Sequence, residues 1–215
     1  MDQSKKVCAI VDAYSSSNLY ASALKERGYE CIAIQSLAQP TALIAGSFRA
    51  ADFTGVIKFT GNLDELASEL KRRQVQLIIP GMEMGLELAD AIGEKMGSHI
   101  FNDPKTSSLR RHKFDMLEAV RKRGLRAARQ FKSSDLNEML TWAKSTNKWP
   151  LVVKPADSGG ADRVFLCNNE MELTAAFQAS FGSRGRQGRG IQELVVQEFM
   201  QGTEYIVDTV SYQGN

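Results

Sequence analysis

The residues of this 215-residue sequence most suited to chemistry are a lysine and a nearby glycine pair. Lys154 follows the apolar run 151–153, and Ser158-Gly159-Gly160 comes shortly after it. Paired glycines allow a loop to turn its backbone N–H groups around an anion, because no Cβ atoms stand in the way. A lysine before such a loop adds a positive charge for the same anion. The segment alone fits a phosphate-binding hairpin and an ordinary glycine turn beside a solvated lysine equally well.

This segment is neither of the common glycine-rich nucleotide motifs. A Walker A loop places Gly-Lys-Ser/Thr at the start of a helix, and a dinucleotide-binding loop has the pattern GxGxxG. The loop after the first predicted strand, 12–17, has no glycine. Because dinucleotide folds hold glycines at that place, NAD binding is not expected.

A second candidate segment lies near the end of the sequence, where an apolar run leads into a connector containing Gly202. The backbone of such a connector can meet a flat heterocycle, while the carboxylate of Glu204 can accept hydrogen bonds from sugar hydroxyls. This signal is weak alone, because a glycine between strands is common and a glutamate is usually a surface residue.

Together, in order and spacing, the two segments resemble the ATP-grasp superfamily of ligases. That superfamily includes carboxylate–amine ligases, such as L-amino-acid ligases and D-alanine–D-alanine ligase, and biotin carboxylase. The resemblance implies that the following residues bind ATP: Lys113, Lys154, Ser158, Gly159, Gly160, Gln197, Glu198, Phe199, Met200 and Glu204.

The resemblance also implies a role for each of them. Lys113 and Lys154 match two phosphate-binding lysines, and the Ser158–Gly160 loop would close over the β- and γ-phosphates. Gln197 would meet the adenine amino group, residues 198–200 would present backbone to the adenine edge, and Glu204 would bind ribose.

The sequence departs from the family pattern in two ways. Asp157 and Asp162 flank the loop, where many relatives have residues that favour phosphate, and we expect Arg163 to offset them. The family's Mg²⁺-binding Glu and Asn and its substrate-binding Arg would fall beyond Asn215. ATP and Mg²⁺ are therefore the implied cofactors, with the metal ligands expected outside this sequence.

The elements that must position these residues form two patterns. In residues 1–104, apolar runs at 7–11, 31–34, 56–59 and 77–79 alternate with helical patterns, with a further short strand expected at 99–101. Asn62 is expected to cap the helix that follows the third run. This alternation predicts a parallel sheet covered by helices. In such a sheet ligands bind beyond the carboxyl ends of the strands, here at 12–17 and 81–83. Glu83 could reach a substrate there, although favouring a helix N-terminus is the simpler role.

The second half predicts antiparallel strands with helices on one face. Two expected helices cover 113–122 and 170–181. Asp135 and Glu138 form a capping-box-like start to a third, which has Leu136, Met139, Leu140 and Ala143 on one face. The expected strands cover 127–131, 151–155, 164–167, 194–200 and 205–212. Residues 182–190 are rich in Gly and Arg and predict a mobile loop.

The fold class is therefore α/β, and the resemblance divides it into three parts. Residues 1–104 form a Rossmann-like pre-ATP-grasp domain with a parallel sheet. Residues 105–192 form the α+β ATP-grasp lid subdomain, and residues 193–215 form the hinge and first strands of a truncated catalytic subdomain. The chain is accordingly expected to be an inactive N-terminal fragment of a longer ligase.

Composition is that of an ordinary folded protein, with 43% hydrophobic and 24% charged residues. No apolar run approaches the ~18 residues of a membrane helix, so no membrane association is expected. The three cysteines are widely spaced in apolar sequence, which predicts buried free thiols in the cytoplasm.

Nine Lys and Arg residues lie between 110 and 132 in a chain of net charge +2. We call these residues the basic band and expect a solvated face, apart from Lys113. The alternative is a nucleotide- or nucleic-acid-binding module without ligase chemistry, whose nucleic-acid affinity would fall steeply with salt. The band lacks the interleaved aromatic residues of single-strand binders, so nucleic acid is not the expected partner.

The predicted function is ATP-dependent joining of a carboxylate to an amine, with an amino acid among the candidate substrates. In the family, ATP phosphorylates the carboxylate, and an amine attacks the acyl phosphate. No covalent nucleophile of the protein is needed, so no catalytic residue is assigned. A bicarbonate-using reaction of the biotin-carboxylase or carbamoyl-phosphate type remains the alternative, and a homo-oligomer is compatible with the sequence.

Overall fold

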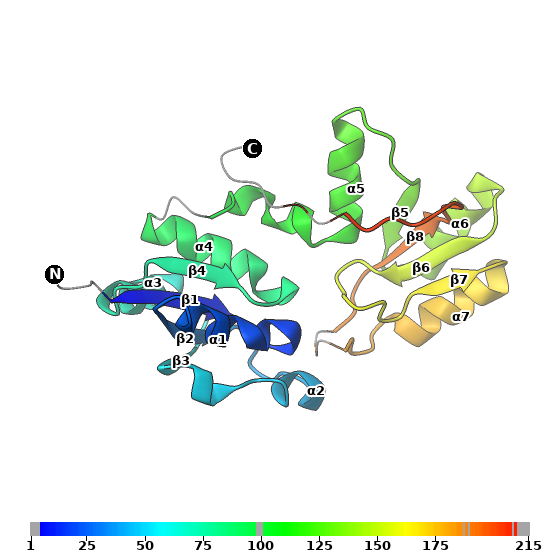
Figure 1. The fold of residues 1–215 in the computed structure, drawn as a ribbon. Helices are drawn as coiled ribbons and strands as arrows, with labels where there is room; N and C mark the ends of the chain where they lie inside the picture. Colours follow the sequence, from blue (N-terminus) through cyan, green and yellow to red (C-terminus); the bar gives the residue numbers. More distant parts are fainter. Residues whose placement is uncertain (1–4, 98–100, 187, 189, 208, 210–215) are drawn as a thin grey trace.

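The computed structural model describes residues 5–97, 101–186, 188, 190–207 and 209, and two four-stranded sheets organise them (Figure 1). The first sheet is parallel, with strand order β3-β2-β1-β4. Its strands are β1 (Lys6–Val11), β2 (Tyr29–Gln35), β3 (Gly55–Lys58) and β4 (Leu77–Pro80). The predicted parallel sheet of the first half is therefore confirmed.

Helices cover both faces of this parallel sheet. Successive side chains of a strand point to opposite faces, so Val7 and Val11 of β1 pack beneath α3 (Leu63–Arg72) and α4 (Leu86–Met96). Ile10, on the other face, packs with Ala21 and Leu24 of α1 (Tyr20–Lys25), the helix that follows the 3-10 helix η1 (Ser15–Leu19). The connection from β2 to β3 carries α2 (Ala42–Ala45) and η2 (Ala50–Asp52), and η3 (Glu83–Gly85) precedes α4.

The three cysteines are free and buried, as predicted. Cys8 and Cys31 lie in the core beneath α1. Burial, with a smaller contribution from Cys31, raises the pKa of the Cys8 thiol to about 12. Cys8 is therefore a protonated core residue.

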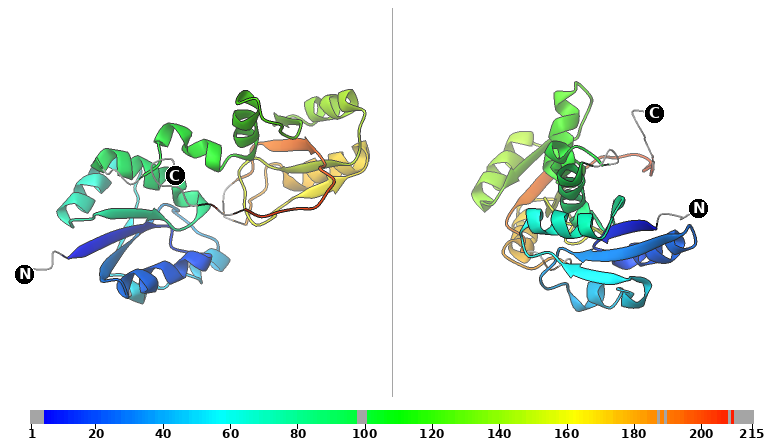
Figure 2. Two further views of the ribbon diagram at one scale, coloured as in Figure 1. Left: turned by 45° about the horizontal axis from the view of Figure 1, so that its top comes forward. Right: turned by 90° about the vertical axis from the view of Figure 1, so that its left-hand side faces the viewer.

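The second sheet is antiparallel, with strand order β5-β8-β6-β7. Its strands are β5 (Gln130–Ser133), β6 (Leu151–Pro155), β7 (Phe165–Cys167) and β8 (Leu194–Glu198). Helices α6 (Leu136–Thr146) and α7 (Glu170–Ser180) pack on one face, and α5 (Lys113–Lys122) contacts the other (Figure 2). The candidate residues lie on the α5 face.

Local sequence signals set several of these helices. The Asn62 side chain caps α3 by accepting from Glu65 N at 3.1 Å, and Asp135 caps α6 by accepting from Asn137 N at 2.7 Å. Side chains of this kind satisfy N–H groups that have no partner within the helix. Both caps were predicted from the sequence.

Three predicted strands differ from the structure. The strand expected at 127–131 begins only at Gln130, because its register is set by pairing with β8. The strand expected at 194–200 ends at Glu198. The strand expected at 205–212 is wrong for residues 205–207 and 209, which are exposed and pair with no strand of the described chain; the rest of it lies outside the described residues. The strand expected at 99–101 falls mostly outside them as well.

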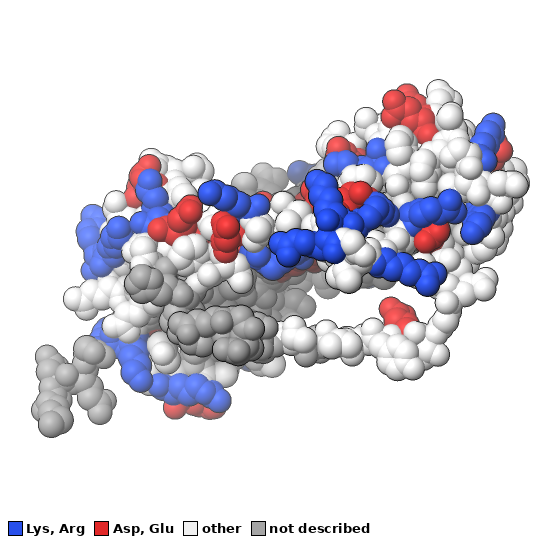
Figure 3. Space-filling model, turned by 90° about the horizontal axis from the view of Figure 1, so that it is seen from above, with Lys and Arg blue, Asp and Glu red and all other residues white. Residues whose placement is uncertain are grey.

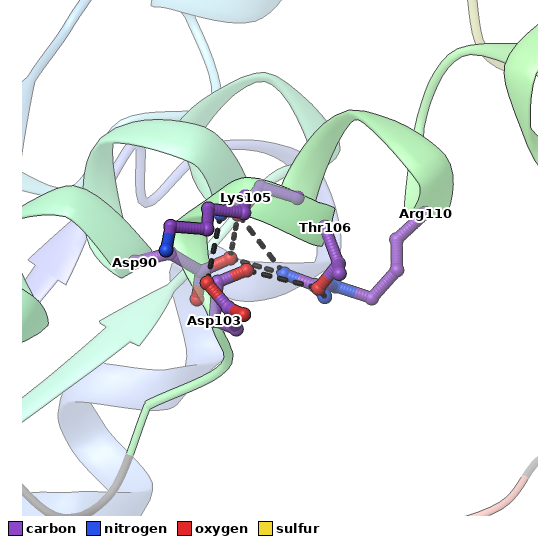
Figure 4. A network of polar contacts seen from close by, with 6 residues as sticks. Asp90, Asp103, Lys105, Thr106 and Arg110 are labelled. Carbon is purple, nitrogen blue, oxygen red and sulfur yellow. Dashed lines mark hydrogen bonds and ion pairs between the residues drawn. The ribbon is translucent and has the colours of Figure 1, made fainter.

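A 3-10 helix, η4 (Pro104–Arg110), lies between the two sheets in the sequence and forms polar contacts with α4 (Figure 4). Arg110 forms an ion pair with Asp90, a buried residue of α4. Asp103 begins η4 by accepting from Lys105 N at 2.9 Å, and Arg110 also donates to Thr106 Oγ1 at 3.1 Å. Because a carboxylate is rarely buried without a partner, the Asp90–Arg110 pair fixes where the connector leaves the first sheet.

Candidate functional site

The two candidate lysines meet beside the glycine hairpin that joins β6 and β7. Lys113 is the first residue of α5, and its Nζ donates to the carbonyl of Ser158. The N–H of Lys113 also donates to Ala156 O, at 3.0 Å. Lys154 lies on β6, at the entry to the same hairpin. Residues 41 positions apart in the sequence therefore supply two cationic groups to one place.

A side-chain cap explains why α5 begins at Lys113. The Nδ1 atom of His112 accepts from Asp115 N at 3.3 Å. His112 Nε2 lies 3.7 Å from the Glu193 carboxylate. His112 is only partly exposed, and it orients the first turn of α5.

Burial and a neighbouring cation lower the pKa of both lysines. Burial lowers the pKa of Lys154 from its ordinary value of 10.5, and the charge of Lys113 lowers it further. Burial also lowers the pKa of Lys113, while Glu83 and Asp157 oppose that effect and Arg111 adds to it. An anion bound between the lysines would relieve both costs, because an opposite charge stabilises the protonated forms.

These shifts predict a pH dependence that separates folding from anion binding. The unfolded chain holds the Lys154 proton more tightly than the folded chain, so stability should rise with pH from the lowered pKa up to about 10.5. Binding of inorganic pyrophosphate should weaken over the same window, because it favours the charged lysine. Urea unfolding and pyrophosphate titrations between pH 7.5 and 10.5 would measure both trends, with Lys154→Met as the reference. Parallel pH profiles for wild type and variant would contradict the prediction.

The hairpin itself has the backbone shape that its glycines allow. Gly160 has φ of 66°, in the left-handed region, and an added Cβ there would meet no atom within 4 Å. Ser158 is buried, and its hydroxyl lies 3.5 Å from Asp162 O. The Ser-Gly-Gly segment therefore forms a closed turn directly above Lys113.

Both acidic residues that flank the hairpin have partners. Asp157 forms an ion pair with Arg111, and Asp162 accepts from Arg186 N at 2.6 Å. Arg163 does not offset them as expected, because its guanidinium donates to Ala179 O at the end of α7, at 2.6 Å. The neutralising residues are thus Arg111 and the backbone of the Gly/Arg loop.

Arg111 is a residue beside the hairpin that the sequence did not indicate. Its side chain is only 4% exposed, whereas the basic band was expected to be solvated. It forms ion pairs with Asp157 in the hairpin and, at 3.5 Å, with Glu87 on α4. Because Glu87 belongs to the first half of the chain, Arg111 ties that half to the hairpin. No sequence signal distinguishes it from its neighbours in the band, since burial arises from tertiary packing.

Gln197 lies beside Lys154 on the face of the second sheet that α5 contacts. Lys154 Nζ donates to Gln197 Oε1 at 2.8 Å, and both glutamine and lysine are largely removed from solvent. The structure therefore brings together Lys113, Lys154, Ser158 and Gln197, four of the predicted site residues.

Gly159 and Gly160 lie in the hairpin with Ser158, and the four other predicted residues lie at or beyond the end of β8. The Glu198 N–H donates to Arg129 O at 2.9 Å, and its carboxylate pairs with Arg129 at 3.1 Å, so neither is free for a ligand. Phe199 and Met200 are half-exposed. Glu204 is exposed, and its role in ribose binding stays a prediction.

A cavity of about 500 Å³ lies where the first sheet faces the hairpin. Its lining includes Ser15 after β1, Met82 and Glu83 after β4, and Gly159 and Gly160. The predicted functional edge of the parallel sheet thus faces the glycine hairpin. Gly81 is required at this edge, because an added Cβ would lie 2.6 Å from Asp12 O.

The basic band is only partly a free positive surface. Figure 3 shows Lys and Arg side chains over η4 and α5, with Asp and Glu side chains among them. Arg110, Arg111 and Arg121 each pair with a carboxylate. Such pairing reduces the positive potential that nucleic-acid phosphates would meet.

The described residues hold neither a metal-binding cluster nor a membrane-spanning helix. No group of three or more His, Cys, Asp or Glu residues there is placed to hold a metal ion. None of the helices in the described part of the chain is both long and apolar enough to cross a membrane.

Comparison with known proteins shows which proteins this chain resembles. No protein-family model matches the chain. Dapdiamide A synthase of Enterobacter agglomerans is 30% identical over 211 residues, which cover 98% of this chain and 50% of that protein. The chain thus spans about half the length of the curated relative that it matches.

Solved structures agree on the fold. L-amino acid ligase from Bacillus licheniformis superposes with a TM-score of 0.64 at 14% identity, over 92% of this chain and 45% of that one. The biotin carboxylase domain of Hydrogenobacter thermophilus 2-oxoglutarate carboxylase, solved with MgADP, ADP and bicarbonate, gives 0.62 at 18% identity, over 90% and 44%. The resemblance to ATP-grasp proteins is therefore confirmed at the level of the fold: this chain shares the fold of about 45% of each of these two proteins and is a relative of dapdiamide A synthase.

Proposed function

We propose that this chain forms the adenine-nucleotide half of an ATP-dependent ligase that joins a carboxylate to an amine. The observation that carries the proposal is the convergence of Lys113 and Lys154 on the Ser158–Gly160 hairpin, beside Gln197. Two partly buried cations and a glycine turn fit a polyphosphate, whose negative charges stabilise the charged lysines. The similar biotin carboxylase domain was solved in complex with ADP, which supports an adenine nucleotide.

Each residue has one task in this proposal. ATP supplies the phosphoryl group that activates the carboxylate. Lys113, Lys154 and the hairpin hold and orient the phosphates, and positioning with charge stabilisation is the main contribution of a protein to such a transfer. Gln197 and the backbone of 198–200 meet adenine, apart from the Glu198 N–H, which already donates to Arg129 O, and Glu204 meets ribose. Mg²⁺ accompanies the nucleotide, and we assign no described residue to the metal.

The proposed division of the chain is 1–104, 105–192 and 193–215. The parallel sheet in the first part and the antiparallel sheet formed mainly in the second support it, although β8 comes from the third. The three buried free thiols support a reducing compartment, the cytoplasm.

The class of carboxylate is the open choice within this proposal. An amino acid is favoured by the L-amino acid ligase among the neighbours, and bicarbonate by the biotin carboxylase. Their TM-scores of 0.64 and 0.62 are so close that the fold does not decide between them. The 30% identical relative is a dapdiamide synthase, which favours an amino-acid-like carboxylate and an amine.

A phosphate-release assay on the protein that contains this chain would test the function. ATP consumption should depend on a carboxylate and an amine together, with amino-acid pairs as the first panel and bicarbonate as the comparison. Dependence on bicarbonate alone would support the alternative. Unchanged turnover in Lys154→Ala would contradict the role of Lys154, and the absence of substrate-dependent ATP consumption across both panels would contradict the function.

A further inference from the structure

A chain of side-chain hydrogen bonds leads away from Lys154 and is buried at its centre. Lys154 Nζ donates to Gln197 Oε1 at 2.8 Å, and Gln197 Nε2 donates to Gln130 Oε1 at 3.2 Å. Gln130 Nε2 in turn donates to Phe114 O at 2.8 Å and to Glu118 Oε1 at 3.1 Å. Gln130 and Gln197 are each 9% exposed. Because both amides are buried, an unsatisfied polar atom in this hydrogen-bond network would be costly.

The direction of the hydrogen bonds in this network is fixed by the chemistry of the groups at its two ends. A charged lysine can only donate, so Gln197 must turn its oxygen toward Lys154. A backbone carbonyl and a carboxylate can only accept, so Gln130 must turn its nitrogen toward Phe114 and Glu118. The Gln130 oxygen is then left to accept from the Gln197 nitrogen. Both amide orientations follow from donor and acceptor chemistry alone.

Strand pairing places the two glutamines against each other. Gln130 of β5 and Gln197 of β8 are direct partners in the antiparallel register, and side chains at such positions lie within reach across the strands. Lys154 pairs with Val195, two residues before Gln197, so its side chain is a diagonal neighbour on the same face. A carbonyl oxygen has two lone pairs. Lys154 is the donor to Gln197 Oε1 within the described chain, so one acceptor position remains.

We propose that Gln130 is a positioning residue that makes this site select adenine over guanine. The proposal rests on the proposed function, in which Gln197 faces the six-position of the purine. Adenine carries an amino group there, which donates to an oxygen, whereas guanine carries a carbonyl oxygen, which accepts. With Gln130 and Lys154 in place, Gln197 can offer only its oxygen, so guanine would set two acceptors against each other. Without Gln130, Lys154 alone opposes rotation of the Gln197 amide, so offering the amide nitrogen to guanine costs less than in the wild type.

Two substitutions separate this positioning role from a merely structural one. Gln130→Met removes the acceptor for Gln197, and the preference for ADP over GDP should fall about tenfold, the value of roughly one hydrogen bond. Gln130→Glu keeps an acceptor for Gln197 but places a carboxylate beside Glu118. It should lower thermal stability yet retain the wild-type preference. Calorimetric titration of the whole protein with ADP and with GDP, in excess Mg²⁺, measures the preference. Ser133→Ala, on the same strand but outside the chain of hydrogen bonds, is the control.

The outcomes distinguish this inference from the proposed function. If the wild-type protein binds neither nucleotide, the assignment of the nucleotide site is contradicted, and so is the role of Gln130. If wild type prefers ADP and Gln130→Met keeps that preference, Gln130 does not position Gln197. Should Gln130→Met fail to fold, Gln130→Glu still decides, because loss of the ADP preference in that variant contradicts the proposal. Loss of the preference in Ser133→Ala would also overturn it.

Discussion

Lys154→Met is expected to remove most of the stabilisation that ADP gives this protein, while leaving the unliganded protein about as stable as wild type. A hydrogen bond to a charged group contributes about 1.5–3 kcal/mol, which corresponds to a roughly 10- to 100-fold weaker dissociation constant. The unliganded protein loses a desolvated charge that Lys113 repels, which offsets the lost donor to Gln197. Its free energy of unfolding should therefore change by less than about 1 kcal/mol. Thermal unfolding with and without ADP measures both effects.

Lys122→Met is the matched control for this prediction. Lys122 is an exposed residue of α5, the helix that begins at Lys113. Its replacement changes the net charge by the same amount but removes no contact with the hairpin. If both variants lose the ADP-dependent shift equally, the effect is one of net charge, and the assignment of Lys154 is contradicted.

Arg111→Met is expected to cost about 2–3 kcal/mol of unfolding free energy. Removing one partner of a buried ion pair leaves the other uncompensated, and the cost is about 3–5 kcal/mol when both partners are buried. Here Asp157 and Glu87 are 36% and 51% exposed, so water screens them and the cost is smaller. Because Arg111 ties the hairpin to α4, ADP binding should weaken as well. Urea unfolding and an ADP titration would measure the two effects.

Arg126→Met is the control for Arg111, since Arg126 is an exposed member of the same basic band. It should change stability by no more than about 0.5 kcal/mol, as surface substitutions usually do. A loss for Arg111→Met no larger than that of Arg126→Met would show that the buried ion pairs do not hold the hairpin.

Elements with strong local signals were predicted well from the sequence. The helix expected at 113–122 is observed at the same residues, and the capping side chains Asn62 and Asp135 fixed where α3 and α6 begin. The apolar runs of the first half became the strands of the parallel sheet, because buried strands of such sheets are continuously apolar. In these segments the information lies in adjacent residues.

Features that depend on distant partners were not predicted. The start of β5 depends on its pairing with β8, and the apolar residues 205–207 have no strand beside them in the described chain. The burial of Arg111 depends on carboxylates from two other elements. Gln130 carries no signal in its own segment, and its contact with Gln197 emerges only once the register is known. Lys113 was found through the family resemblance rather than through any local property, whereas Lys154 was also indicated by the glycine pair that follows it.

Calorimetric titration of the wild-type protein with ADP in excess Mg²⁺ tests the central claim most directly. The account predicts one ADP bound per chain, with an affinity that Lys154→Met weakens about 10- to 100-fold and that Lys122→Met leaves within about twofold. Absence of binding, or binding that is insensitive to Lys154, would contradict the claim that Lys113, Lys154, the Ser158–Gly160 hairpin and Gln197 form an adenine-nucleotide site.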